Sequence, residues 1–370
     1  MLNQRMSASV TNLLSRFRGC LVGGLIGDCL GSPFEGDDPI SRSVLQNFMD
    51  KQLKESSKLF QVFSYTDDTA MTKSMVESFV QMKSFDAKDM SKKFTMEYIK
   101  EPKRGYGGNV VDVFSALNSI NYEHPYEPAR HQFNGTGSYG NGGAMRTSPA
   151  ALFGYNLSDK ELISLAANCA RITHSHRNGF NGAILQCLAI RLALDTETSQ
   201  TDQSFDINLY LNRLIEKMNE IEVNGCESDS ESDGLNTNGL SRTPYTDKLK
   251  KIKELFSDES KIKGLSSERV AYLFGNDVSA LNSVPSAIYC ALRAQKPIDD
   301  IESDNPFVRT LYFALSLGGD TDTIASMACS IAGALYGHQL IPNVLQKRCE
   351  DIDLIVKYAD NLYSFVSNVD

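Results

Sequence analysis

The chain has 370 residues, of which 41% are hydrophobic and 22% charged, so it can bury a sizeable core in one large domain or two average ones. The formal net charge of -9 argues against direct DNA binding, because nucleic-acid binding usually needs a basic face that releases counterions from phosphates. No uninterrupted apolar stretch reaches the roughly 18 residues of a membrane-spanning helix, so we expect a soluble protein with no membrane contact.

The N-terminal segment predicts the first core helix. Apolar residues recur with helical spacing between Leu13 and Leu21 and run directly into a glycine pair. The first 27 residues also hold three arginines and no acidic residue, which weakly resembles a mitochondrial transit peptide, but the apolar spacing favours a helix. The eight cysteines are scattered without a CxxC pair, which is typical of reduced core residues in an intracellular protein.

A glycine- and proline-rich turn follows at residues 27–36, GDCLGSPFEG. It places Glu35 outside a helix, where the carboxylate could reach a metal site or act as a mobile gate. Without other signals, a glutamate in such a turn is more often a solvated loop residue, and this is the alternative for Glu35. Asp28 is interpreted as a buried polar residue that is hydrogen-bonded to neighbouring backbone.

Two acidic clusters of the same design lie far apart in the chain, YTDDT at residues 65–69 and GGDTDT at residues 318–323, and each opens a predicted helix. A single carboxylate at a helix N-terminus is ordinary capping, but doubled carboxylates repel one another unless cations lie between them. Hard oxygen ligands without His or Cys suit magnesium, manganese or calcium, and neither cluster is an EF-hand. We therefore predict a binuclear magnesium centre, with hydroxyl ligands from Thr66 and Thr323 and a capping alternative for Thr69 and Thr321.

Helical periodicity dominates the rest of the chain. Apolar residues at intervals of three and four between Met71 and Met82 predict one buried helix face, and Ser158 with Glu161 forms a capping-box pattern. Further helices are predicted over residues 182–194, 207–221, 268–274, 285–293 and 324–336, the fourth with Ser283 as its cap and proline in its first turn. Alternating strands are absent, so we predict an all-α fold in a single domain, residues 1–370, with an exposed loop at residues 227–243.

A glycine-rich segment occupies residues 133–144, FNGTGSYGNGGA. Its backbone N–H groups can turn towards a phosphate or diphosphate, although it is neither a Walker loop nor a Rossmann fingerprint. Phe133 and Tyr139 flank the segment and could stack on a nucleobase, although packing aromatics would look identical in sequence. The Thr-His-Ser-His run at residues 173–176 lacks cysteine partners at zinc spacing, so His174, at the end of a predicted helix, is a candidate for ligand contact.

The motifs taken together resemble the ADP-ribosylglycohydrolase family, including the DraG-like enzymes. The resemblance spans nearly the whole chain and rests on residues 27–35, 65–69, 137–146, 173–174, 181–183 and 318–323. The nearest branch acts on serine-linked ADP-ribose, poly(ADP-ribose) and O-acetyl-ADP-ribose rather than on arginine-linked ADP-ribose. Residues 226–239 are the principal departure, because this acidic segment is longer than in the family.

The resemblance implies a compact orthogonal helical bundle with two magnesium ions and assigns a role to each motif residue. Its metal-binding positions are Glu35, Thr66, Asp67, Asp68, Asp320, Asp322 and Thr323, with Glu35 as a mobile gate. Its substrate-binding positions are Asp67, Gly105, Phe133, Thr136, Gly137, Ser138, Tyr139, Gly140, Asn141, Gly142, His174 and Val278. Among these, Gly137, Ser138, Tyr139, Gly140 and Asn141 of the glycine loop (residues 133–144) would hold the diphosphate. Phe133 and Tyr139 would sandwich adenine.

The implied reaction is hydrolysis at the distal ribose C1″ bond through an oxocarbenium-like transition state, which releases ADP-ribose. Glu35 is the first candidate for proton transfer and Asp320 the second. A two-metal phosphohydrolase and a noncatalytic ADP-ribose-binding protein remain the alternatives. We expect a monomer whose partners are ADP-ribosylated proteins, poly(ADP-ribose) and O-acetyl-ADP-ribose. The family branch suggests DNA damage repair in nucleus and cytoplasm, and the basic N-terminus suggests mitochondrial import.

Overall fold

The computed structural model describes residues 2–36, 39–54, 61–196, 205–228, 241–262, 265–299 and 301–367, with backbone alone at residues 2–12 and 225–228. Within these ranges the regular elements are helices, and pairing between extended segments is limited to isolated bridges. The long helices are α1 (Leu2–Gly31), α2 (Arg42–Leu53), α3 (Asp67–Met82), α4 (Ala87–Lys100), α5 (Gly108–Ser119), α9 (Asp159–Arg171), α10 (Arg177–Asp195), α11 (Ile207–Ser228), α12 (Pro244–Phe256), α14 (Ser267–Phe274), α15 (Ala280–Arg293), α16 (Pro306–Ser316), α17 (Thr321–Tyr336) and α19 (Ile352–Ser367). The short ones are η1 (Ser32–Phe34), α6 (Glu127–Arg130), η2 (Gln132–Gly135), α7 (Gly142–Met145), α8 (Ser148–Phe153), α13 (Glu259–Ile262), η3 (His338–Leu340) and α18 (Asn343–Gln346).

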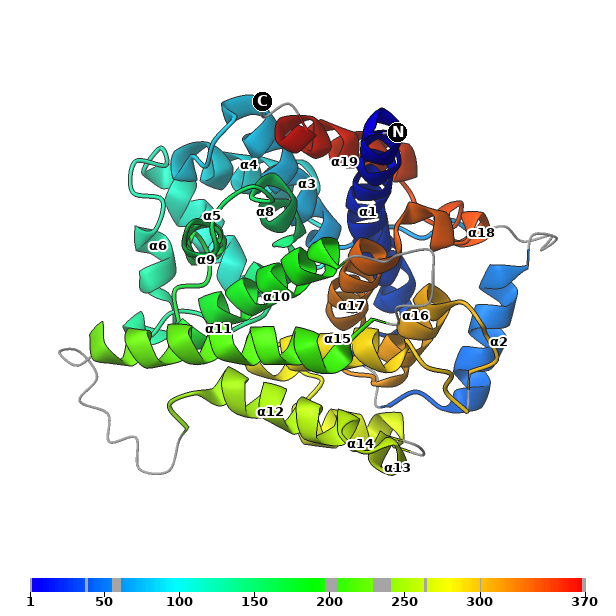
Figure 1. Ribbon diagram of the computed structural model, residues 1–370. Helices are drawn as coiled ribbons and strands as arrows, with labels where there is room; N and C mark the ends of the chain where they lie inside the picture. Colours follow the sequence, from blue (N-terminus) through cyan, green and yellow to red (C-terminus); the bar gives the residue numbers. More distant parts are fainter. Residues whose placement is uncertain are drawn as a thin grey trace.

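The helices cross one another steeply, as predicted for an orthogonal bundle. In Figure 1, α1 and α17 run down the middle of the molecule while α11 and α12 run across it. None of the described helices is both long and apolar enough to cross a bilayer. The seven cysteines with described side chains are free and buried, as predicted. The single-domain prediction stays a prediction.

A stripe of small residues joins α1 to α17 at backbone contact. Glycines on α1 recur every fourth residue, and a Cβ built at Gly23 would lie 2.3 Å from the carbonyl oxygen of Cys329. A Cβ at Gly27 would likewise lie 2.3 Å from the Ala325 carbonyl oxygen. Only glycine permits this approach, because any side chain would overlap the partner backbone. The contact brings the end of α1 beside Asp322 in the first turn of α17.

Both acidic clusters open helices, as predicted, and the capping box at the start of α9 is confirmed. Ser158 Oγ accepts from the Glu161 backbone N–H at 3.4 Å, and a Glu161 carboxylate oxygen accepts from the Ser158 N–H at 3.0 Å. Such local patterns are readable from sequence because donor and acceptor lie within one turn. Helix α17 lies in the interior, since residues 321–335 are all buried.

The start of α15 was predicted wrongly. The helix begins at Ala280, so Ser283 is not its cap and Pro285 lies in its interior. Proline cannot donate to the carbonyl of Leu281, four residues earlier. The Lys248 ammonium of α12 donates to that oxygen instead, at 3.0 Å. A long-range partner therefore satisfies the carbonyl that the proline leaves without its helical donor.

The predicted loop at residues 227–243 also needs correction at its start. Helix α11 continues to Ser228, beyond the predicted end at residue 221. The middle of the loop, residues 229–240, lies outside the described residues. Its last residues lead directly into α12, which begins at Pro244.

Candidate active site

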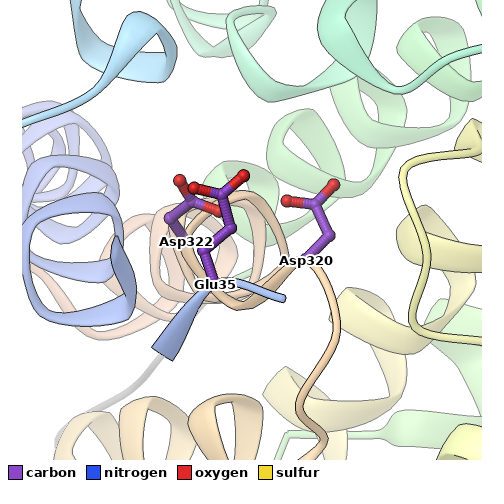
Figure 2. A group of neighbouring side chains, drawn as sticks. All are labelled: Glu35, Asp320 and Asp322. Atoms are coloured by element: carbon purple, nitrogen blue, oxygen red, sulfur yellow. The ribbon is translucent and has the colours of Figure 1, made fainter. Parts of the chain in front are cut away.

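The two acidic clusters meet at one end of a cleft of about 430 Å³. Thr323 Oγ1 donates a hydrogen bond to Asp68 Oδ1 at 3.2 Å, across 255 residues of sequence. One carboxylate oxygen from each of Glu35, Asp320 and Asp322 lies within 4.8 Å of the others. Figure 2 shows these three carboxylates on the same side of the N-terminal end of α17. The clusters therefore form one site, as their design predicted.

Asp28 holds the first cluster in place from beneath. Its carboxylate accepts from the Thr66 N–H at 2.9 Å, the Thr69 N–H at 3.0 Å and the Thr69 hydroxyl at 2.6 Å. These groups belong to the N-terminal turn of α3, whose N–H groups have no partner within the helix. The sequence correctly indicated a buried, hydrogen-bonded Asp28, but its partners lie on another helix rather than on neighbouring backbone.

Some threonines of the two clusters hold helix ends by hydrogen bonds, whereas Thr323 faces the cleft. Thr66 is the N-cap of α3, and its Oγ1 accepts from the Asp68 N–H at 3.3 Å. Thr321 Oγ1 donates to the Gly31 carbonyl at 2.9 Å and so ties α17 to α1. The bonds of Thr69 and Thr321 match the capping and structural alternative, whereas Thr323 lines the cleft.

Burial raises the pKa of four carboxyl groups of the site. Burial, followed by the charges of neighbouring carboxylates, raises the pKa of Asp67 to about 7 and that of Asp322 to about 10. The same causes raise the pKa of Asp68 well above its usual value. Burial and the nearby Asp320 raise the pKa of Glu35, which lies at the exposed rim. The site holds several acidic groups at close range.

This excess of negative charge fits a divalent cation. Among the described ion pairs, none includes a carboxylate of this site. Asp68 Oδ2 is buried and has no hydrogen-bond partner among the described residues. Buried carboxylates are normally paired or bound to a metal, and an all-oxygen donor set is what magnesium, manganese and calcium prefer. The residues present can therefore bind a metal of this kind.

The glycine loop is joined directly to the second cluster by Asn141. The Asn141 amide donates to an Asp320 carboxylate oxygen at 2.5 Å, and its backbone N–H donates to the Val278 carbonyl at 2.9 Å. The Asp320 N–H donates to the Asn276 carbonyl at 2.8 Å. A Cβ at Gly319, where φ is +69°, would lie 2.1 Å from that same carbonyl oxygen, so the turn requires glycine. Residues 275–279 thus support both the loop and the acidic end of the cleft.

Two exposed aromatic rings line the cleft. Phe133 and Tyr139 are 44% and 50% exposed, and their ring centroids lie 6.1 Å apart with 35° between the planes. A flat base between two rings needs about 7 Å, which is twice the contact distance of about 3.5 Å between carbon atoms. The two rings would therefore need to move slightly further apart to admit a nucleobase between them.

Most of the predicted site residues line this cleft. They are Glu35, Asp67, Asp68, Gly105, Phe133, Ser138, Tyr139, Gly140, Asn141, Gly142, His174, Val278, Asp320, Asp322 and Thr323. Three predicted residues are not part of the lining. Thr66 is the N-cap of α3, Thr136 is exposed and donates to the Phe133 carbonyl, and Gly137 packs against Ser175. The roles of all these residues in binding stay predictions.

Several lining residues escaped the sequence analysis: Met71, Tyr106, Gly107, Asn109, Val110, Gln132, Met145 and Arg146. Tyr106 and Gly107 directly follow Gly105, and Arg146 ends the glycine-rich motif, so their proximity in sequence was a usable signal. No local pattern distinguishes Met71 or Val110 from core residues, because an apolar cleft wall and an apolar core use the same side chains.

The two histidines of the Thr-His-Ser-His run have separate surroundings. His174 lines the cleft, and burial together with Arg146 lowers the pKa of His174 to about 3. The Nδ1 of His176 accepts from the Asn178 N–H at 3.0 Å and so caps α10. Neither joins a group of metal-binding side chains among the described residues.

An all-helical fold with paired acidic helix N-termini beside a glycine-rich cleft defines a class of protein, and comparison with known proteins agrees. The chain matches the ADP-ribosylglycohydrolase family over residues 9–368 and belongs to that family, so it is a glycoside-cleaving hydrolase. It is 42% identical to ADP-ribosylhydrolase ARH3 of Homo sapiens over 355 residues, which cover 95% of this chain and 93% of that relative. ADP-ribosylhydrolase ARH3 of Bos taurus is 41% identical over 363 residues, which cover 96% and 94%.

A solved structure described as an ADP-ribosylglycohydrolase-related protein complex has the same fold. The two superpose with a TM-score of 0.61 over 96% of this chain and 99% of the other, at 20% sequence identity. At that identity the likeness concerns the fold alone.

Proposed function

We propose that this protein is a magnesium-dependent hydrolase that cleaves the distal ribose C1″ O-glycosidic bond of ADP-ribosylated serine, poly(ADP-ribose) and O-acetyl-ADP-ribose. The observation that carries the proposal is the meeting of the two acidic clusters, 3.2 Å apart at Thr323 and Asp68, at the end of a cleft shared with the glycine loop. The names and similarity of the vertebrate relatives support ADP-ribosyl hydrolysis.

The cleft offers groups that suit each part of ADP-ribose. Phe133 and Tyr139 offer exposed rings for adenine. The glycine loop would hold the diphosphate with those backbone N–H groups that the loop does not already use in its own hydrogen bonds. The acidic clusters would receive the distal ribose, and a volume of about 430 Å³ is in the range of small-molecule sites.

The acidic end is where two magnesium ions would be held, by Glu35, Thr66, Asp67, Asp68, Asp320, Asp322 and Thr323. When bound, such ions would supply electrostatic stabilisation and lower the pKa of a coordinated water. Asn141 would fix the orientation of the Asp320 carboxylate through its amide hydrogen bond. Asp28, through the N-terminal turn of α3, would keep Asp67 and Asp68 directed at the same point.

Glu35 is the proposed proton-transfer residue. In hydrolysis the oxygen of water bonds to C1″ while the bond from C1″ to the serine oxygen breaks, and one proton moves from the water to the leaving oxygen. A carboxyl group with a raised pKa at the rim of the site can accept the first proton and return it. Asp320 remains the second candidate, because its carboxylate lies in the same cluster.

The test is product identity with a serine-ADP-ribosylated peptide, in magnesium and in a chelator. We expect intact ADP-ribose and unmodified peptide in magnesium only, with arginine-linked substrate turned over far more slowly. AMP with ribose phosphate on the peptide would establish a phosphohydrolase instead. Tight binding of ADP-ribose without turnover of serine-linked, polymeric or O-acetyl substrate would establish a noncatalytic binding protein.

The expected biological setting follows from the same proposal. We propose that the substrates are ADP-ribosylated proteins and poly(ADP-ribose), met by a monomeric enzyme in nucleus and cytoplasm. Import into mitochondria remains a prediction from the basic N-terminal segment, for which the helix α1 offers the competing structural explanation.

A further inference from the structure

His174 lies beneath the glycine loop with one ring nitrogen at the cleft. A Cβ built at Gly142 would lie 2.7 Å from Cε1 of the ring and 3.0 Å from Nε2, so the imidazole fills the space that a side chain would need. The residue is 8% exposed and lines the cleft. Among the described residues, Nε2 has no hydrogen-bond partner. This nitrogen is therefore the one that a ligand can meet.

The other ring nitrogen, Nδ1, is held by Thr173. The Thr173 Oγ1 lies 2.7 Å from Nδ1 and accepts from the Arg146 guanidinium at 2.7 Å. Thr173 is fully buried, and its hydroxyl has no other partner in the described part of the chain. If Nδ1 carried the ring proton, the hydroxyl proton of Thr173 would have no acceptor, which buried polar groups rarely tolerate. The hydroxyl proton has an acceptor when it is donated to Nδ1, and this places the ring proton on Nε2, the nitrogen that a ligand can meet.

Arg146 is a buried cation without a described carboxylate partner. It is 1% exposed, and besides Thr173 it donates to the backbone carbonyls of Gly142 and Cys169. Its guanidinium also lies over the Phe94 ring, 4.7 Å from the centroid. A positive charge behind the glycine loop disfavours an imidazolium, in keeping with the pKa of His174, which burial and Arg146 lower to about 3. The ring is neutral at physiological pH.

We propose that Arg146 and Thr173 form a relay that holds His174 as the neutral tautomer protonated on Nε2, so that the cleft presents a fixed N–H donor to the diphosphate of the ligand. Phosphate oxygens only accept hydrogen bonds, whereas the opposite tautomer would present a lone pair to them. His174 is the contact residue, and Arg146 and Thr173 are positioning residues. The identity of the ligand rests on the proposed function, but the tautomer does not.

The tautomer is tested first, in the ligand-free protein. Histidine-selective ¹⁵N labelling gives signals from five residues, and the variant His174→Gln identifies the one that belongs to His174. We expect the pattern of a neutral ring with its proton on Nε2 at neutral pH. A proton on Nδ1, or an imidazolium, would overturn the relay without any reference to ligand or activity.

The relay itself is tested with the matched variants Thr173→Val and Thr173→Ser. Valine keeps the shape but removes the hydroxyl, so we expect a mixture of tautomers, an ADP-ribose affinity about tenfold weaker and a corresponding rise in KM, with less than about threefold change in kcat. Serine keeps the hydroxyl and should restore the Nε2–H pattern and an affinity within about threefold of wild type. Melting curves show whether both variants are folded.

The possible outcomes separate the relay from the proposed function. Wild-type affinity in Thr173→Val would overturn the relay while leaving the hydrolase intact. If the protein shows the expected tautomer but binds neither ADP-ribose nor ADP, the proposed function and the contact between His174 and a diphosphate are wrong. The relay that sets the tautomer would still stand. If Thr173→Val does not fold, the wild-type tautomer and the Thr173→Ser variant still decide.

Discussion

At the scale of single residues, Asp28 determines where the acidic site forms. Its carboxylate accepts a hydrogen bond from Thr66, the N-cap residue of α3, 38 residues later in the chain, and Asp28 does not line the cleft. Burial raises the pKa of Asp28 to about 6, against the opposing effect of its hydrogen bonds, so the carboxylate is largely ionised at neutral pH. Within the described part of the chain, this charge has backbone and hydroxyl donors as its partners and no lysine or arginine.

Replacing Asp28 with asparagine should disturb both stability and the site. The amide would turn an N–H donor towards the donors of Thr66 or Thr69, and we expect the free energy of unfolding to fall by about 2–3 kcal/mol. The magnesium concentration needed for half-maximal turnover should also rise. Urea denaturation and a magnesium titration measure these effects. The matched control is Asp86→Asn, since Asp86 caps α4 locally and asparagine caps equally well. Equal behaviour of the two variants would contradict the role of Asp28.

Glu35→Gln separates proton transfer from binding. Glutamine keeps the shape of the side chain but cannot accept a proton, so we expect turnover of a serine-linked peptide to fall by about a hundredfold. Affinity for ADP-ribose, measured by calorimetry, should stay within about threefold of wild type. Glu123→Gln is the control, because Glu123 is exposed and lies outside the cleft. Wild-type turnover in the Glu35 variant would exclude an essential proton-transfer role.

At the scale of elements, the α1–α17 contact sets the geometry of the site. The two helices meet at backbone distance along the glycine stripe, and the clustered carboxylates Glu35, Asp320 and Asp322 are attached to the ends of this pair. Glu35 follows α1, and Asp320 and Asp322 open α17. A shift of one helix against the other would move these carboxylates apart, so packing remote from the cleft controls its chemistry.

Gly23→Ala tests that dependence, with Gly24→Ala as the matched control. The new methyl group at position 23 would lie 2.3 Å from a backbone oxygen, which cannot move without the whole of α17. We expect a loss of about 1–3 kcal/mol in stability, as in overpacked cores, together with reduced turnover. At position 24 the nearest atom is the Ser330 hydroxyl, which can rotate away. Calorimetry should show a much smaller loss of stability for Gly24→Ala than for Gly23→Ala. Equal losses in the two variants would contradict the role of the glycine stripe.

At the scale of the whole molecule, pH and metal should be linked through folding. The folded-state pKa values of Asp67 and Asp322, about 7 and about 10, exceed the unfolded value of about 3.9. Such groups contribute stability that is full below the unfolded pKa and is lost as pH rises through the folded pKa. Metal-free protein should therefore become less stable from about pH 6.5 to pH 8.5. His174 acts oppositely, but only between its folded pKa of about 3 and the unfolded value near 6.5.

Magnesium should reverse this loss, because it binds the ionised carboxylates in competition with protons. We expect its stabilising effect to grow with pH and to reach about 3 kcal/mol when its concentration is a hundred times the dissociation constant. Scanning calorimetry with magnesium or a chelator at several pH values measures it. The variant Asp68→Asn should lose most of the effect. If magnesium stabilised the protein at about pH 6 as much as at higher pH, or more, the result would argue against a carboxylate metal site.

The sequence by itself determined the all-α class, several of the helices and the chemistry available to the site. Helix periodicity, the capping box of Ser158 and the acidic openings of α3 and α17 depend on contacts within a turn or two, so they are readable locally. The start of α15 was misread, because its Pro285 is accommodated by Lys248 from another helix.

Tertiary structure alone decided how these parts meet. Only packing brings Thr323 to Asp68, places Asp28 under α3, and sets Arg146 and Thr173 behind His174. These contacts join residues whose separation in the chain carries no periodic signal. The physical reason is that close packing of backbones along the glycine stripe needs two helices that are distant in sequence. Buried polar groups likewise find their partners anywhere in the fold rather than within their own segment.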